Sequence, residues 1–220
     1  MVGKPLVRKA NEKASGREGV VKWGQDPRPE RREVPPHLVQ RFRDEAKNME
    51  RLNGTQGILP VWDIDHDQPD APRWYAMPLG KLLDDHLGDD ATLREVVEHV
   101  AFLADTLAGL AQANNFHRDV RPANLLWWDG HPVLADFGIA VWDAGAQSGL
   151  TRPGDKIGAA NFIDPEMRHR CPAQPGKRAD VYSLAKTLFV LAVPGRGPYP
   201  PDGTHRGADT SSHYGRPAVA

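Results

Sequence analysis

Residues 117–124 read His-Arg-Asp-Val-Arg-Pro-Ala-Asn, and the triplet Asp-Phe-Gly follows at residues 136–138. Between them lie Leu-Leu-Trp-Trp (125–128), an Asp-Gly pair and Pro-Val-Leu (132–134). Apolar runs on either side of Asp-Gly predict a β-hairpin with a tight turn. A hairpin brings the chain back to its starting point, so we expect Asn124 and Asp136 to lie at the same end of it.

The polar residues of these two stretches suit phosphoryl transfer. That reaction requires little covalent help; it needs an acceptor hydroxyl held in line and divalent metal ions that neutralise the phosphates. Asp119 supplies a carboxylate for the acceptor, and Asn124 and Asp136 supply the oxygen ligands that Mg²⁺ prefers. Asp-Phe-Gly alone arises easily by chance. Its combination with His-Arg-Asp, an Asn five residues later and a hairpin is specific.

This combination resembles the eukaryotic-like protein kinase family in its bacterial Ser/Thr branch, whose signature is a His-Arg-Asp catalytic loop followed by Asp-Phe-Gly. Further pieces occur in the family's order. Asp164-Pro165-Glu166 resembles the Ala-Pro-Glu motif, and Asp180 begins a segment similar to the central helix of the large lobe. Upstream, Val20-Val21-Lys22 resembles the strand with the ATP-binding lysine. Residues 74–80 resemble the strand that leads into the hinge.

The resemblance implies a role for each matching catalytic residue. Asp119 would orient the acceptor hydroxyl and take its proton, while Asn124 and Asp136 would hold Mg²⁺. Arg121 stands where the family has a catalytic-loop lysine and would neutralise the γ-phosphate, although an arginine is a planar fork rather than a point charge. Lys22, paired with Glu45, would grip the α- and β-phosphates of ATP.

The same resemblance implies an adenine site and a set of internal supports. Met77 would lie at the back of the adenine pocket, and the backbone of Leu79 and Gly80 would meet adenine. Asp180 would brace the backbone of residues 117–118. The side chains that would stack as an apolar spine between the lobes are His117, Phe137 and Met49.

The implied fold is α+β and bilobal, with a small strand-rich N-lobe and a mainly helical C-lobe. We expect an incomplete N-lobe at residues 1–79, a C-lobe with the catalytic loop and activation segment at 80–193, and a disordered Gly/Pro-rich tail at 194–220. We also expect truncation at both ends. The first strand and the Gly-rich loop are missing, because only Gly3 stands where that loop should precede Lys22, and the family's last helices are missing too. Ala159 replaces a threonine that Ser/Thr kinases have.

Hydrophobic periodicity predicts the elements around these motifs. We expect strands at residues 19–23, 58–64 and 73–77, and helices at 37–52, 92–114 and 180–193.

The composition of the chain limits the kinds of partner that we expect it to bind. The 220 residues carry 28 basic and 29 acidic side chains, a formal charge of −1, which argues against binding nucleic acid by bulk charge. No apolar run is long enough to cross a bilayer, so we expect no membrane segment in this chain. The single cysteine, Cys171, fits a reducing, cytoplasmic compartment. The expected partners are ATP and a protein substrate.

The predicted activity is ATP-dependent phosphoryl transfer to Ser or Thr hydroxyls, with Pro122 favouring Ser/Thr over Tyr by resemblance. Ser148 and Thr151 are candidate phosphorylation sites in the activation segment. One alternative is a pseudokinase or inactive kinase fragment that acts as a binding or regulatory module. Another is a small-molecule phosphotransferase of kinase-like fold, against which the motifs follow the protein-kinase pattern.

Overall fold

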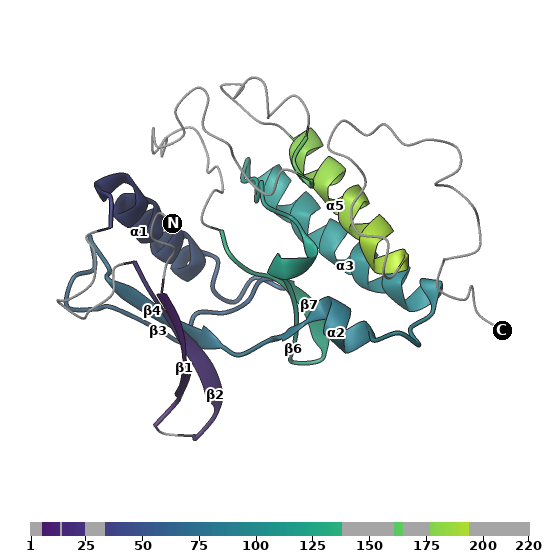
Figure 1. Cartoon of the computed structure of the whole chain (residues 1–220). Helices are drawn as coiled ribbons and strands as arrows, with labels where there is room; N and C mark the ends of the chain where they lie inside the picture. Colours follow the sequence, from purple (N-terminus) through teal and green to yellow (C-terminus); the bar gives the residue numbers. More distant parts are fainter. Residues whose placement is uncertain (1–5, 14, 25–33, 138–160, 165–176, 194–220) are drawn as a thin grey trace.

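The computed structural model describes residues 6–13, 15–24, 34–137, 161–164 and 177–193 (Figure 1). The expectations for Ser148, Thr151, Ala159 and the tail at 194–220 therefore lie outside the described residues. The same holds for Gly138 of Asp-Phe-Gly, and of Asp164-Pro165-Glu166 only Asp164 is described.

The first half of the chain forms an antiparallel four-stranded sheet with one helix beside it (Figure 1). Its strands run in the order β1-β2-β4-β3. Directly opposed residues of an antiparallel pair share one face of the sheet. Val7, Lys22 and Tyr75 are opposed in register across three strands and so share a face. The strand bounds are Leu6–Asn11 (β1), Glu18–Trp23 (β2), Asp63–Ile64 (β3) and Trp74–Pro78 (β4).

Helix α1 (Pro36–Arg51) begins with a proline, whose ring suits the first turn of a helix. It buries Phe42, Glu45, Ala46 and Met49, which recur at helical spacing on one face. Phe42 stacks on Tyr75 of β4, with ring centroids 5.6 Å apart. The helix that carries Glu45 is thus packed against the sheet that carries Lys22.

The second half is mainly helical, around a small antiparallel sheet in the order β5-β6-β7. Helices α3 (Leu93–Gln112) and α5 (Lys177–Ala192) lie side by side in it (Figure 1). Thr92 and Glu95 form a capping box at the start of α3, which satisfies N–H groups that the first turn leaves open. The other bounds are Lys81–Leu82 (β5), Leu83–Leu87 (α2), Pro122–Asn124 (η1), Leu125–Trp128 (β6) and His131–Leu134 (β7).

The predicted hairpin is confirmed as β6 and β7. Asp129 and Gly130 form its two-residue turn, and both have positive φ angles, 49° and 81°, as a type I′ turn requires. The N–H of Ala135 donates to the carbonyl of Asn124 at 2.9 Å, so Asp136 follows directly where the hairpin closes. The predicted helices are also confirmed, with ends shifted by one to three residues.

The strand predicted at residues 58–64 is wrong over most of its length, since only Asp63–Ile64 is a strand. Trp62 still donates its backbone N–H to Ala76 of β4, but the backbone of residues 57–59 bonds elsewhere. The N–H of Leu59 donates to the carbonyl of Leu134, and the N–H of Leu134 to the carbonyl of Gly57. This segment therefore ties the first half of the chain to β7 of the second. Gly57 has a φ of +78°, and a Cβ there would lie 2.0 Å from Thr106 Oγ1, so the position requires glycine.

Two histidines hold the small sheet against its helices. The ring of His86 on α2 stacks on Trp127 of β6, with centroids 3.8 Å apart and planes 8° apart. His99 of α3 contacts the same indole at 5.0 Å. Burial lowers the pKa of His86, and the nearby Lys81 acts in the same direction. Burial and repulsion from His86 lower the pKa of His99, against the opposing effect of Glu95 and Glu98.

These shifts predict a loss of stability in acid. The folded chain favours neutral rings, while the unfolded chain takes up protons at the ordinary pKa of 6.5. The contribution of these two histidines to the free energy of unfolding should therefore be fully present above pH 6.5. It should be lost as the pH falls through their lowered pKa values in the folded chain. Urea denaturation across this range would measure it. The double variant His86→Gln/His99→Gln should show a shallower pH dependence than the wild-type chain, and an equal slope in the two would contradict this origin.

Candidate active site

The loop that holds Asp119 is anchored by a carboxylate from α5. Asp180 is buried, and its two oxygens accept the backbone N–H groups of His117 at 2.9 Å and Arg118 at 2.7 Å. Arg118 has a φ of +68°, a conformation unfavourable for a residue with a side chain. The two bonds to Asp180 hold the backbone in it. The expected brace of residues 117–118 is confirmed.

His117 joins this loop to the segment after β7. Its Nε2 lies 3.1 Å from the carbonyl oxygen of Ala135, which can only accept, so Nε2 carries the proton. Its Nδ1 is then the acceptor for the N–H of Asp119, at 3.2 Å. The buried ring contacts Phe137 at 4.4 Å, which confirms that expected contact, and Met49 belongs to the same buried core as Phe137.

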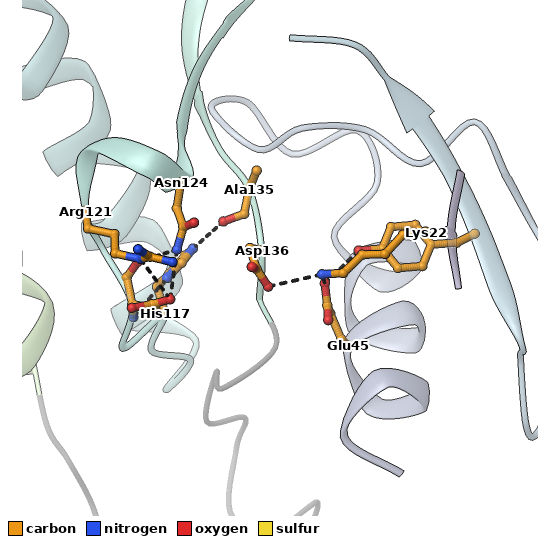
Figure 2. A network of polar contacts seen from close by, with 9 residues as sticks. Lys22, Glu45, His117, Arg121, Asn124, Ala135 and Asp136 are labelled. Atoms are coloured by element: carbon orange, nitrogen blue, oxygen red, sulfur yellow. Dashed lines mark hydrogen bonds and ion pairs between the residues drawn. The ribbon is translucent and has the colours of Figure 1, made fainter. Parts of the chain in front are cut away.

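The Asp119 carboxylate accepts hydrogen bonds from both Arg121 and Asn124. Figure 2 shows the side chains of Arg121 and Asn124 close together. The Nδ2 of Asn124 donates to the backbone oxygen of Asp119 at 2.8 Å and to its Oδ2 at 2.9 Å. Both partners are acceptors, so the amide nitrogen must face them and the amide oxygen faces the other way. The Nε of Arg121 donates to the same Oδ2 at 3.3 Å. The Asp119 side chain stays 15% exposed.

Lys22 pairs with Glu45 and also reaches Asp136, its Nζ lying 3.2 Å from Asp136 Oδ1. Lys22 and Glu45 are buried, while the Asp136 side chain is 45% exposed. Burial lowers the pKa of Lys22, but the charges of Glu45 and Asp136 outweigh it and the net shift is upward, so the ammonium persists. In Figure 2 Asp136 lies between this pair and the group around Asn124.

The three residues expected around adenine, Met77, Leu79 and Gly80, lie in β4 or directly after it. Met77 lies opposite Val20, on the face that carries Lys22, and packs against the core. The N–H of Leu79 already donates to the carbonyl of Glu18 at 3.3 Å, so any contact of Leu79 with adenine would fall to its carbonyl. Gly80 lies against β6, where a Cβ would meet the Cβ of Leu126 at 2.9 Å. Their contact with adenine stays a prediction.

Two residues of this region were missed by sequence reasoning. Val7 lies opposite Lys22 on β1 and is 51% exposed on that face. The signal for it was a hairpin around Gly16, whose φ is +72°, because the hairpin pairs residues 6–11 with the lysine strand. Tyr75, also opposite Lys22, donates its hydroxyl to Glu45. A tyrosine in an apolar strand gives no sequence signal for that role.

Comparison with known proteins agrees with this geometry. The protein kinase domain family matches residues 4–213. The chain belongs to this family. Among curated relatives, serine/threonine-protein kinase PknL of Mycobacterium tuberculosis is 33% identical over 178 residues, covering 75% of this chain and 41% of that protein. PknB of the same species is 31% identical over 180 residues, covering 76% and 27%. A probable PknB of Corynebacterium glutamicum is 29% identical over 171 residues, covering 74% and 26%.

The chain spans about a quarter to two fifths of the length of these relatives. The expected α+β kinase fold is confirmed by the family match and by the strand-rich first half and helical second half. Within the described residues, no helix has the length and apolar character needed to cross a membrane.

Protein kinase domains use ATP and a divalent metal ion, and the residues present fit Mg²⁺. Mg²⁺ keeps several waters and needs only one or two protein ligands besides phosphate oxygens. The amide oxygen of Asn124 and the carboxylate of Asp136 are hard oxygen donors at the same end of the hairpin. No cluster of three or more His, Cys, Asp or Glu occurs in the described part of the chain, so an all-protein metal cage is not found there.

The anchor of the catalytic loop is open to a direct test in this kinase domain. Asp180→Asn replaces one acceptor oxygen by an amide N–H₂ that faces a backbone N–H. We expect the free energy of unfolding, measured by urea denaturation, to fall by about 1–3 kcal/mol, the cost of a buried polar group left without its bond. Asp105→Asn on the exposed side of α3 makes the same chemical change and should cost little. Equal losses in both variants would contradict the anchor.

Proposed function

We propose that this kinase domain transfers the γ-phosphoryl group of Mg·ATP to Ser or Thr hydroxyls of protein substrates. The observation that carries the proposal is the convergence on Asp136. The ammonium of Lys22 reaches it from the sheet, and Asn124, which holds Asp119, lies beside it at the end of the hairpin. The printed names of the curated relatives, all serine/threonine-protein kinases, support the acceptor class.

In this proposal Asp119 is the group that orients the acceptor. Its carboxylate is held by two donors, Asn124 and Arg121, yet it is still in contact with solvent. A carboxylate fixed in this way accepts a hydrogen bond from an incoming hydroxyl. It takes the proton as the hydroxyl oxygen bonds to the γ-phosphorus and the bond from that phosphorus to the ADP oxygen breaks. Because Asn124 bonds both the backbone and the carboxylate of Asp119, the acceptor side and the metal side of the site are positioned together.

Arg121 supplies positive charge beside Asp119. Its Nε contacts the Asp119 carboxylate, and its two Nη atoms carry further N–H donors that suit the oxygens of a phosphoryl group. The charge stabilises the γ-phosphoryl oxygens as negative charge develops on them.

The nucleotide would lie between the two halves of the chain, which we propose are lobes at residues 1–79 and 80–193. Lys22 binds the α- and β-phosphates, and Glu45 holds Lys22 in place. Val7 and Met77 supply apolar surface for adenine, and residues 79–80 supply backbone groups. Asn124 and Asp136 would hold Mg²⁺, which when bound would neutralise phosphate charge. The single cysteine, Cys171, supports a cytoplasmic location.

The acceptor class is tested with γ-labelled ATP, Mg²⁺ and a panel of acceptors. The panel contains Ser-, Thr- and Tyr-bearing proteins and an aminoglycoside. We expect label on phosphoserine or phosphothreonine after hydrolysis of the protein. Label only on tyrosine or only on the aminoglycoside would overturn the proposed acceptor. Nucleotide binding without transfer to any acceptor would instead favour a pseudokinase.

The two aspartates are predicted to fail in different ways. Asp119→Asn should lower kcat at least about a hundredfold, the scale of a lost general base, with little change in affinity for Mg·ATP. Asp136→Asn should abolish metal-dependent nucleotide binding, because it removes a metal ligand. Calorimetry with Mg·ATP and steady-state kinetics separate the two effects. An equal loss of nucleotide binding in both variants would refute these roles.

A further inference from the structure

We propose that Tyr75 is a positioning residue for the nucleotide site, whose buried hydroxyl holds Glu45 in the orientation that receives Lys22. The inference rests on the proposed function, because it assigns to Tyr75 a part in binding the nucleotide phosphates. It starts from one contact: Tyr75 Oη donates to Glu45 Oε1 at 2.6 Å. The same oxygen accepts the hydrogen bond from Lys22 Nζ (Figure 2).

The donor on Tyr75 is itself fixed in space. Tyr75 is 1% exposed and opposes Lys22 in the register of β2 and β4, so both donors rise from adjacent strands on one face of the sheet. The phenol ring stacks on Phe42 of α1, with an angle of 25° between the planes. Strand pairing and ring stacking thus leave the hydroxyl little freedom, whereas a glutamate side chain alone has several rotatable bonds.

Glu45 needs a second donor because it has so little contact with water. It is 3% exposed, and a buried carboxylate that is not fully hydrogen-bonded is costly. With Lys22 as its one partner, the carboxylate would rely on an ammonium that must also face Asp136 and the phosphates. The neutral phenol supplies a bond that does not compete for those groups. Burial raises the pKa of Tyr75 well above its ordinary value, so the hydroxyl keeps the proton that it donates.

Packing alone does not account for a tyrosine at this position. Phenylalanine would fill the same space against Phe42 without burying a hydroxyl. Tyr75→Phe therefore removes the bond to Glu45 while leaving the stack and the strand intact. A loss in this variant reports the hydroxyl and not the ring.

The test compares nucleotide affinity and turnover in Tyr75→Phe with the wild-type chain. We expect the Kd for Mg·ATP, measured by calorimetry, to rise about tenfold, as expected when one hydrogen bond to a charged group is lost. The kcat at saturating ATP should change by less than about threefold, because Asp119 and Asn124 are untouched. Tyr182→Phe, which removes a hydroxyl from α5, is the matched control and should leave the Kd unchanged.

A double-mutant cycle asks whether Tyr75 acts through the ion pair. In a Lys22→Met background, Tyr75→Phe should have no further effect on the residual affinity, since Glu45 then has no lysine to hold. The same tenfold loss in both backgrounds would overturn the proposal, as would an unchanged Kd in Tyr75→Phe. If the wild-type chain binds no Mg·ATP at all, the proposed function fails first, and this inference fails with it.

Discussion

Two oppositely charged side chains, Lys22 and Glu45, lie where almost no water reaches, and this desolvation constrains the structure around them. A buried carboxylate is tolerated only when its oxygens are hydrogen-bonded. Burial raises the pKa of Glu45, while the charge of Lys22 and the hydrogen bond from the Tyr75 hydroxyl act against that rise. The pair therefore sets where α1 must lie relative to β2 and β4. It also sets the orientation of the ammonium that reaches Asp136. Through this ammonium, the sheet of the first half contacts Asp136 at the end of the hairpin.

A second buried carboxylate acts on backbone instead of a side chain. Asp180 accepts two successive N–H groups of the catalytic loop and is carried on a helix that packs against α3. Neither role is interchangeable with the other. Glu45 needs a partner whose charge it balances, whereas Asp180 needs two donors at fixed separation, and these hold Arg118 at a positive φ. His117 connects Asp180 with Asp119. Its backbone N–H donates to Asp180, and its Nδ1 accepts the N–H of Asp119. Its Nε2 donates to the carbonyl oxygen of Ala135. Hydrogen bonds to other residues of the chain therefore determine the position of Asp119.

The parts of this arrangement that could be predicted from sequence are those with local or fixed-spacing signals. The Asp-Gly turn predicted the hairpin, and the hairpin predicted that Asn124 and Asp136 lie together. Helical periodicity predicted α1, α3 and α5 to within a few residues. The features that sequence analysis predicted wrongly or missed are those that depend on pairing between distant segments of the chain. Residues 58–61 have a strand-like composition, but they bond to β7 and to Asn53, so their partners could not be predicted from the local sequence. Val7 and Tyr75 matter because of the register that sets them opposite Lys22, and register is a property of three strands at once.

The local charge balance explains why the metal and the nucleotide must be considered together. Lys22 is one ammonium facing two carboxylates, Glu45 and Asp136, and only Asp136 is substantially exposed. A triphosphate that approached this group unaccompanied would meet a net negative charge at short range, because Glu45 already compensates the lysine. In the proposed function, a divalent cation held by the exposed carboxylate of Asp136 would offset that negative charge and leave the ammonium available to phosphate oxygens. On that proposal, the 3.2 Å contact between Lys22 and Asp136 would weaken when the metal-bound nucleotide binds. The buried contact with Glu45, held from the other side by Tyr75, is the one that has to persist.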